Sequence, residues 1–224
     1  MEREFLFMER AETTQTGSTS PRVVSLNVGD VREIEWQGRI VTTAIWKFPV
    51  AGRLGLRGVN FAGDDQADRT VHGGPDKAVY AYAREDYGFW QGELGVAVPA
   101  GTFGENLTVD GVDLTHAMLG DRWRVGSTLL EVAQPRLPCF KLGIRMDDVR
   151  FPKRFQAAGR MGAYLRVIEE GDVGTGDAIE IERAREGGVT LNEMVKALSD
   201  RETARSLLRA AYLPRFWREV AERG

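Results

Sequence analysis

Residues 122–132, RWRVGSTLLEV, carry the clearest fold signal in the chain. Two short runs rich in β-branched, aliphatic and aromatic residues are separated there by Gly126-Ser127. A glycine-containing pair between two such runs is typical of a tight β-hairpin turn. We therefore predict a β-hairpin across these residues.

Similar runs recur on both sides of this hairpin, and Gly, Asp and Pro residues separate them. Many short strands with glycine-rich turns favour a closed or nearly closed β-barrel with a few interspersed helices. The fold class is therefore predicted to be mainly β. The predicted strand segments, the hairpin included, are Val23–Val28, Arg39–Trp46, Ala78–Ala83, Asn106–Val109, Arg122–Val132, Ala163–Ile168 and Ala178–Glu182.

The pattern changes to a helical period after Gly187-Gly188. Two capping-box patterns follow, Thr190 with Glu193 and Ser199 with Glu202, and Pro214 suits a first helical position. We predict three short helices, which are too small to fold alone and should pack on the barrel or on a partner. The expected organisation is a disordered leader (1–21), a barrel domain (22–186) and a C-terminal three-helix unit (187–224).

Composition excludes several classes of protein. The 224 residues have a formal net charge of −3, so no general basic field attracts nucleic acid or anionic membranes. No apolar run is long enough to span a bilayer, and charged residues interrupt the apolar N-terminal residues where a signal peptide would need them continuous. We therefore expect a cytoplasmic protein. One cysteine excludes both an intramolecular disulfide and a four-thiolate iron–sulfur site.

That cysteine, Cys139, lies in QPRLPCFKL (134–142). Seven basic residues stand between Arg136 and Arg160, against two acidic ones. Cations near a thiol favour the thiolate, the form that binds metals or attacks electrophiles. Two structural interpretations compete with this one: Cys139 as a small buried apolar residue, and the basic residues as a solvated helix face.

The stretch DRTVHGGPDK (68–77) combines adjacent glycines with cations. Gly73 and Gly74 let a backbone approach a ligand closely, and nearby cationic side chains can neutralise an anion. A tight turn between strands is the competing interpretation. The candidate anion-binding side chains are Arg69, His72 and Lys77.

A third stretch, GTFGENL (101–107), offers Phe103 to stack on a planar ring and Asn106 to hydrogen-bond it. It is equally compatible with a glycine-rich turn into a strand. The two histidines are far apart and show no zinc-ligand spacing, so a zinc site made by protein ligands alone is not expected.

These stretches together resemble the MOSC domain family, in its YiiM-type branch with a C-terminal three-helix unit. The combination in this order is specific, whereas each piece alone is weak. The resemblance runs from about Val23 to the end. It is carried by ADRTVHGGPDKAVYAY (67–82), GTFGENLTVDG (101–111) and QPRLPCFKLGIRM (134–146), with support from WKFPVAG (46–52) and GRMGAYLRV (159–167).

The resemblance implies a β-barrel that binds a molybdenum cofactor (molybdopterin), with Cys139 as the metal ligand and as a catalytic residue. His72 and Lys77 are the further catalytic candidates, as proton donors. The implied cofactor-binding residues are Arg69, His72, Gly73, Gly74, Lys77, Phe103, Asn106, Arg136 and Lys141.

The implied activity is reduction of N-hydroxylated compounds, such as hydroxylaminopurine-type bases and hydroxylamines, for detoxification. An external reductase must then supply electrons, because the chain shows no flavin fingerprint and no cluster-binding cysteines. A homodimer is compatible with the sequence. Two other functions compete: a sulfur or molybdopterin carrier that uses Cys139 without turnover, and a non-catalytic anion-binding module that docks a partner.

Overall fold

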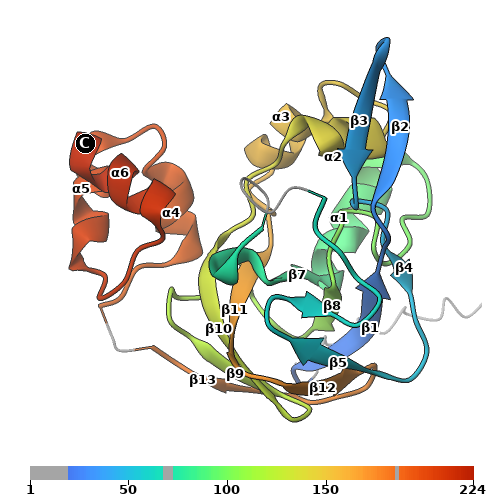
Figure 1. Cartoon of the computed structure of the whole chain (residues 1–224). Helices are drawn as coiled ribbons and strands as arrows, with labels where there is room; N and C mark the ends of the chain where they lie inside the picture. The colour runs from blue at the N-terminus through green and yellow to red at the C-terminus, as the bar shows by residue number, and fades with distance from the viewer. Residues whose placement is uncertain (1–19, 68–72, 185–186) are drawn as a thin grey trace, which may run out of the picture.

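A mixed sheet of eight strands forms the centre of this computed structural model, which describes residues 20–67, 73–184 and 187–224 (Figure 1). The strand order is β13-β9-β10-β11-β7-β8-β1-β4; β7 and β8 are parallel, and the other neighbours are antiparallel. The strands are β1 Arg22–Val28, β4 Phe48–Pro49, β7 Val79–Ala83, β8 Leu107–Asp110, β9 Arg122–Val125, β10 Thr128–Pro135, β11 Ala163–Glu169 and β13 Ile179–Glu182.

The predicted hairpin is confirmed as β9 and β10, with Thr128 paired to Val125. Gly126 has a φ of 57°, in the left-handed region that favours glycine. A Cβ atom there would lie 2.2 Å from the backbone oxygen of Asp172. The turn therefore needs glycine both for its backbone conformation and for close contact with the neighbouring strand.

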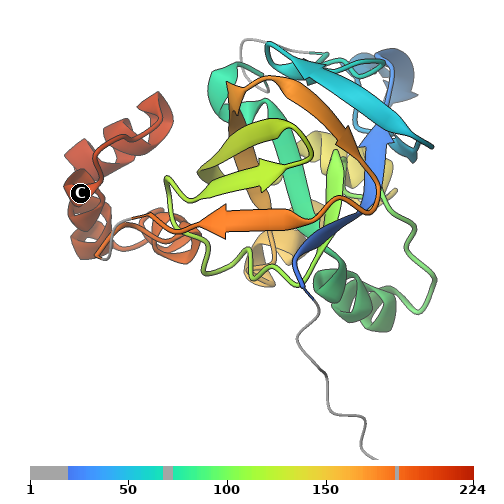
Figure 2. The ribbon, with the colours of Figure 1, turned by 90° about the horizontal axis from the view of Figure 1, so that it is seen from below.

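The prediction of a closed or nearly closed barrel is confirmed only in part, because the described residues form a strand-dominated fold without a closed barrel. The sheet ends at β13 on one side and at β4 on the other, and no continuous ladder joins them. The contacts across the gap join β1 to the residues just before β13: one isolated bridge pairs Arg22 with Ala178, and the Val23 amide donates to Asp177 O at 2.9 Å. The strands therefore curve strongly without closing into a continuous ladder (Figure 2).

Five strands outside the main sheet form two smaller sheets. The three-stranded sheet has the order β12-β5-β6, and β2 pairs with β3 in a separate hairpin. Of these five, β3 falls within a segment that the sequence predicted, Arg39–Trp46, although it ends at Thr43. The strands are β2 Arg32–Trp36, β3 Arg39–Thr43, β5 Arg53–Arg57, β6 Asn60–Phe61 and β12 Gly171–Gly174.

Three helices and one short 3₁₀ turn interrupt the strands: α1 Arg84–Leu94, α2 Phe140–Arg145, α3 Phe151–Ala157 and the turn η1 Pro75–Lys77. The helices contribute to a buried aromatic cluster that is separate from the main hydrophobic core. Trp90 stacks on Phe155 with ring centroids 5.3 Å apart, and Tyr82 lies 4.7 Å from Phe103. Such ring pairs add about 0.5–1.5 kcal/mol each beyond their buried area. This cluster supports the segment that leads from β10 into α2.

The three predicted C-terminal helices are present, with a 3₁₀ turn after the second. They stand to one side of the strands in both views (Figures 1 and 2). Their buried side chains, including Met194 and Trp217, belong to the main hydrophobic core. The helices thus pack on the sheet. They are α4 Leu191–Lys196, α5 Arg201–Ser206, η2 Leu207–Arg209 and α6 Arg215–Arg223.

The helix starts agree only in part with their sequence signals. Thr190 and Glu193 form the predicted capping box of α4. The second predicted box is wrong, because Asp200 caps α5 by accepting a hydrogen bond from the Thr203 amide at 2.8 Å. Aspartate is as strong an N-cap as serine, and here it is one residue closer to the helix. Pro214, predicted as the first helical residue, is instead the N-cap residue of α6, which begins at Arg215.

Candidate functional site

One pocket brings together residues from all three stretches that the sequence singled out. The space between them measures about 690 Å³ when the open solvent at its mouth is included. Its walls come from the loop after β3, the segment after β6, η1, β7, the loop before β8, the segment between β10 and α2, and β11. The residues that line this pocket are Thr43, Ala44, Ile45, Lys47, Asp64, Asp65, Gln66, Ala67, Lys77, Tyr80, Phe103, Gly104, Asn106, Arg136, Leu137, Cys139, Lys141 and Tyr164.

Cys139 is the N-cap residue of α2, where its backbone is still extended. Strand β10 ends at Pro135, and Pro138 follows three residues later, so the chain cannot continue in a ladder and turns toward the pocket. The thiol is neither fully buried nor fully exposed. Cys139 lines the pocket and is not fully buried, unlike a cysteine that only fills space in a core.

Arg136 is the buried cation of the pocket, with 4% of its surface exposed. Its guanidinium carbon lies 5.6 Å from the ring centroids of both Tyr80 and Phe155, in cation–π geometry. Burial opposes its charge, but the phenols of Tyr80 and Tyr164 and the thiol of Cys139 raise the pKa of Arg136 above its usual value. Arg136 is thus a fixed positive charge at the pocket wall.

One guanidinium nitrogen of Arg136, Nη1, is buried and has no hydrogen-bond partner among the described residues. An unpaired buried donor costs about 1–3 kcal/mol, and more when it is charged. A ligand that brings an acceptor oxygen or sulfur into the pocket would remove that cost. This orphan donor is the strongest local sign that the pocket binds an anion.

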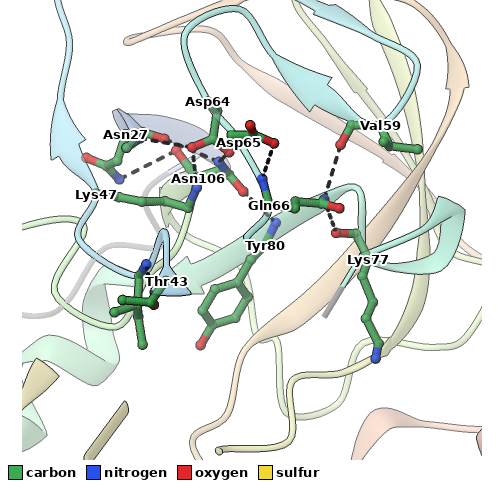
Figure 3. Close-up of polar contacts among 12 residues, drawn as sticks. Asn27, Thr43, Lys47, Val59, Asp64, Asp65, Gln66, Lys77, Tyr80 and Asn106 are labelled. Carbon is green, nitrogen blue, oxygen red and sulfur yellow. Dashed lines mark hydrogen bonds and ion pairs between the residues drawn. The ribbon is translucent and has the colours of Figure 1, made fainter. Parts of the chain in front are cut away.

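A second buried cation, Lys47, pairs with Asp64 in the pocket wall (Figure 3). Their side chains are 8% and 3% exposed. Burial lowers the pKa of Lys47, although the Asp64 carboxylate opposes that effect. Asp64 also accepts a hydrogen bond from the Gly29 amide at 2.9 Å. The pair therefore ties the loop after β3 to the segment after β6, and sequence reasoning named neither residue as a candidate.

Asn106 serves the protein framework, which differs from its predicted role in binding a ligand. Its side-chain oxygen accepts from the Tyr80 amide at 3.2 Å, and its amide nitrogen donates to Asp64 at 2.8 Å and to the Asn27 backbone oxygen at 3.3 Å (Figure 3). Both ends of the side chain are occupied. Asn106 thus positions the pocket wall.

Phe103 also differs from its predicted role as a stacking platform. Its side chain is fully buried, and the rings of Tyr82, Tyr87 and Phe155 lie within 5.3 Å of its centroid. Aromatic neighbours therefore occupy the ring that a planar ligand would need. The residue lines the pocket as part of the aromatic cluster beneath it.

The glycines around Phe103 allow its loop to approach the segment after β3. Gly101 has a φ of 84°, and a Cβ atom there would lie 2.4 Å from the Lys47 backbone oxygen. Buried Glu105 holds the same loop by accepting from the amides of Gly101 at 2.7 Å and Phe103 at 3.1 Å. Burial raises the pKa of Glu105. The Glu105 side chain thus fixes the loop by binding the loop's backbone amides.

The structure places the remaining predicted residues as follows. Lys77 and Lys141 line the pocket, and Figure 3 shows the Lys77 side chain extended from η1 on the same side as the Tyr80 ring. Gly74 precedes η1 with a φ of 94°, a conformation that suits glycine, and Gly73 stands before it. Arg69 and His72 lie outside the described residues, so their predicted roles stay predictions.

Two further observations bear on the chemistry. Among the described residues, no group of three or more His, Cys, Asp and Glu side chains could hold a metal ion. A metal at Cys139 would therefore need ligands from a cofactor.

None of the helices in the described part of the chain has the length and apolar character needed to cross a membrane.

Comparison with known proteins places the chain in a family. A model of the MOSC domain matches residues 68–180. The chain belongs to the MOSC domain family. Protein YiiM of Escherichia coli (strain K12) is 37% identical over 191 residues, which cover 81% of this chain and 84% of YiiM. The crystal structure of YiiM from Geobacillus stearothermophilus matches with a TM-score of 0.74 at 28% identity, covering 91% of this chain and 98% of that one.

This is therefore a YiiM-type MOSC protein, as its motifs predicted. A protein named Reductase from Gibberella moniliformis (strain M3125 / FGSC 7600) is also similar, with 34% identity over 148 residues; the match covers 64% of this chain and 26% of that protein. The matched MOSC segment contains Lys77, Arg136, Cys139 and Lys141. Lys47 and Asp64 lie before it, so residues outside the MOSC match complete the pocket.

Proposed function

We propose that the chain is a molybdenum-cofactor-dependent reductase of N-hydroxylated compounds. The observation that carries the proposal is the pocket itself, in which the single thiol, Cys139, shares a wall with the buried cation Arg136. Membership of the MOSC family supports the cofactor. The substrate class, hydroxylaminopurine-type bases and hydroxylamines, rests on the resemblance to YiiM-type proteins.

The described residues fit such a cofactor. Cys139 would hold the metal, because a soft thiolate suits molybdenum and the cofactor brings the remaining sulfur ligands. The phosphate would lie near cations, for which the pocket offers Arg136, Lys77 and Lys141. The Nη1 of Arg136 supplies a donor that none of the described residues uses. The further candidates for binding the cofactor are Arg69, His72, Gly73 and Gly74.

The cofactor, when bound, supplies a two-electron redox centre that can take the oxygen from an N–OH group. Overall, the N–OH compound takes up two electrons and two protons and yields the N–H compound and water. The chain supplies proton donors near Cys139. Tyr164 lines the same pocket, but burial raises the pKa of its phenol despite the opposing effect of Arg136, so it is the weaker candidate for donating a proton. The other candidate donors are Lys77, which lines the same pocket, and His72, which lies outside the described residues.

The electrons are proposed to come from an external reductase. A single cysteine excludes a cluster-binding set within the chain. The other partner of the proposed reaction is the small N-hydroxylated substrate, and we place the reaction in the cytoplasm. Nucleic acid and membranes are not among the proposed partners.

Reductase-coupled turnover tests this function. We expect protein expressed in a molybdopterin-competent host to contain molybdenum and to convert 6-hydroxylaminopurine to adenine when a flavin reductase supplies electrons. Protein that contains molybdenum but converts no N-hydroxylated compound would support the carrier alternative. Molybdenum-free protein from the same host would contradict the proposed cofactor.

Charge reversal at Lys77 should weaken cofactor retention more than charge removal. Lys77→Glu puts a carboxylate in the pocket wall, whereas Lys77→Gln only removes the cation. A lost charged hydrogen bond corresponds to roughly a 10-fold loss of affinity, and like-charge repulsion adds to it. The measurement is molybdenum per chain during dialysis. Full retention by Lys77→Glu would exclude Lys77 from the anion site.

A further inference from the structure

Asp76, in the η1 turn next to Lys77, is held from the C-terminal helices. The Tyr212 hydroxyl, from the segment between η2 and α6, donates to Asp76 Oδ2 at 2.8 Å. Arg166 of β11 lies 3.1 Å from Asp76 Oδ1 and packs its guanidinium 4.0 Å from the Tyr212 ring centroid. Tyr212 thus acts on the turn twice, directly through its hydroxyl and indirectly through its ring on Arg166.

A second connection reaches the same turn through the core. The buried Trp217 indole of α6 donates to Gln134 Oε1 at 3.1 Å, and the Gln134 amide donates to the Asp76 backbone oxygen at 3.0 Å. Trp217 is fully buried and Gln134 is 5% exposed. Both connections join residues more than 50 positions apart in sequence, so they exist only when the helices are packed on the sheet.

The turn is also held by its own backbone and by the strands next to it. It is a single 3₁₀ turn of three residues, and its N-cap, Gly74, makes no side-chain capping bond. Its own backbone bond joins the Lys77 amide to Gly74 O at 3.0 Å, and Gln66 donates to the Lys77 backbone oxygen at 3.2 Å. Because hydrogen bonds in 3₁₀ turns generally have poorer geometry than those in α-helices, a single such turn depends partly on its neighbours for a fixed position.

We propose that Tyr212 and Trp217 are positioning residues, through which the C-terminal helices fix the η1 turn and with it Lys77 in the pocket wall. The importance of Lys77 rests on the proposed function, whereas the fixing of the turn does not. The C-terminal helices contribute no residue to the pocket wall, yet they would control the place of one of its cations. Loss of the Tyr212 hydroxyl should therefore weaken cofactor retention without unfolding the protein.

Hydrogen exchange in Tyr212→Phe tests the fixing of the turn. The variant keeps the ring on Arg166 and loses the bond to Asp76. Because hydrogen bonds to charged groups are strong and Tyr212 is partly exposed, we expect exchange in a peptide covering 73–79 to be about 3- to 10-fold faster. Exchange elsewhere should be unchanged. Glu219→Gln is the control, because Glu219 forms its ion pairs with Arg215 and Arg223 within α6.

Molybdenum retention in Lys77→Met and in the double variant tests the link to the pocket. The Tyr212→Phe variant should release molybdenum about 3- to 10-fold faster than wild type. The double variant should release it no faster than Lys77→Met alone. Equal acceleration in both backgrounds would show that Tyr212 does not act through Lys77. Unchanged exchange at 73–79 would overturn the proposal. If even the wild type lacks molybdenum, the proposed function fails, and the exchange result still decides whether Tyr212 holds the turn.

Discussion

Cys139→Ser should lose its molybdenum and its reductase activity while the protein stays folded. Serine is nearly isosteric with cysteine, and Cys139 is only partly buried, so the free energy of unfolding should change by less than ~1 kcal/mol. A hydroxyl is a much poorer ligand for a soft metal site. Changes to groups that merely support a ligand cost about 10- to 100-fold, so loss of the ligand should cost at least ~100-fold in activity.

Three measurements on wild type and Cys139→Ser, made side by side, separate the interpretations. They are molybdenum content, the midpoint of thermal unfolding, and reduction of 6-hydroxylaminopurine with a supplied reductase. Cys139→Ala is the matched control, since it also removes sulfur but offers no oxygen. A lower unfolding temperature with full molybdenum content would indicate a structural cysteine, and equal activity in all three proteins would refute the role of the thiol.

Trp217→Ala should have the largest effect on stability. The side chain is fully buried in the main core, and its indole N–H bonds to buried Gln134 at 3.1 Å. Truncation of a buried aromatic residue to alanine costs about 3–5 kcal/mol, a large part of the total stability of a typical domain. Urea unfolding gives the change in free energy directly. It should be monitored by the circular dichroism of the backbone, because the variant removes a tryptophan.

Phe216 provides the matched control on the same helix. Its side chain is 48% exposed and meets Trp217 edge-on at 5.2 Å, so Phe216→Ala should cost no more than about 1 kcal/mol. Equal losses in the two variants would mean that α6 is not anchored through Trp217. A near-neutral Trp217→Ala would show that the C-terminal helices contribute little to the core.

Local sequence patterns predicted many of the strands, but they did not predict that the sheet stays open. Runs of β-branched residues located β1, β7 and β11 within a residue or two. REIEW, which forms β2, has three charged residues, and RLGLR, which forms β5, contains a glycine and two arginines. Neither segment shows a strong strand signal in its own sequence. Each forms a strand because pairing with a neighbouring strand stabilises it. Closure of a barrel likewise depends on pairing between distant strands, which local patterns do not report.

The site could be predicted where a residue has a distinctive chemistry. Cys139, Arg136, Lys141 and Lys77 were all expected in one pocket, and the structure brings them to one. Lys47 was not found, because a lysine in sequence suggests solvent exposure until its buried partner is known. The orientation of Phe103 also depends on tertiary packing, since the same side chain can face a ligand or a cluster of other rings.

Thiol titration tests the central claim, that Cys139 binds molybdenum, most directly. The chain has one cysteine, so an alkylating reagent reports on Cys139 alone. That thiol is partly exposed, so molybdenum-free protein should be alkylated to one equivalent under native conditions. If Cys139 binds molybdenum, alkylation should fall in proportion to molybdenum content and return when the metal is removed. Full native alkylation of molybdenum-loaded protein, with the metal still bound, would contradict it.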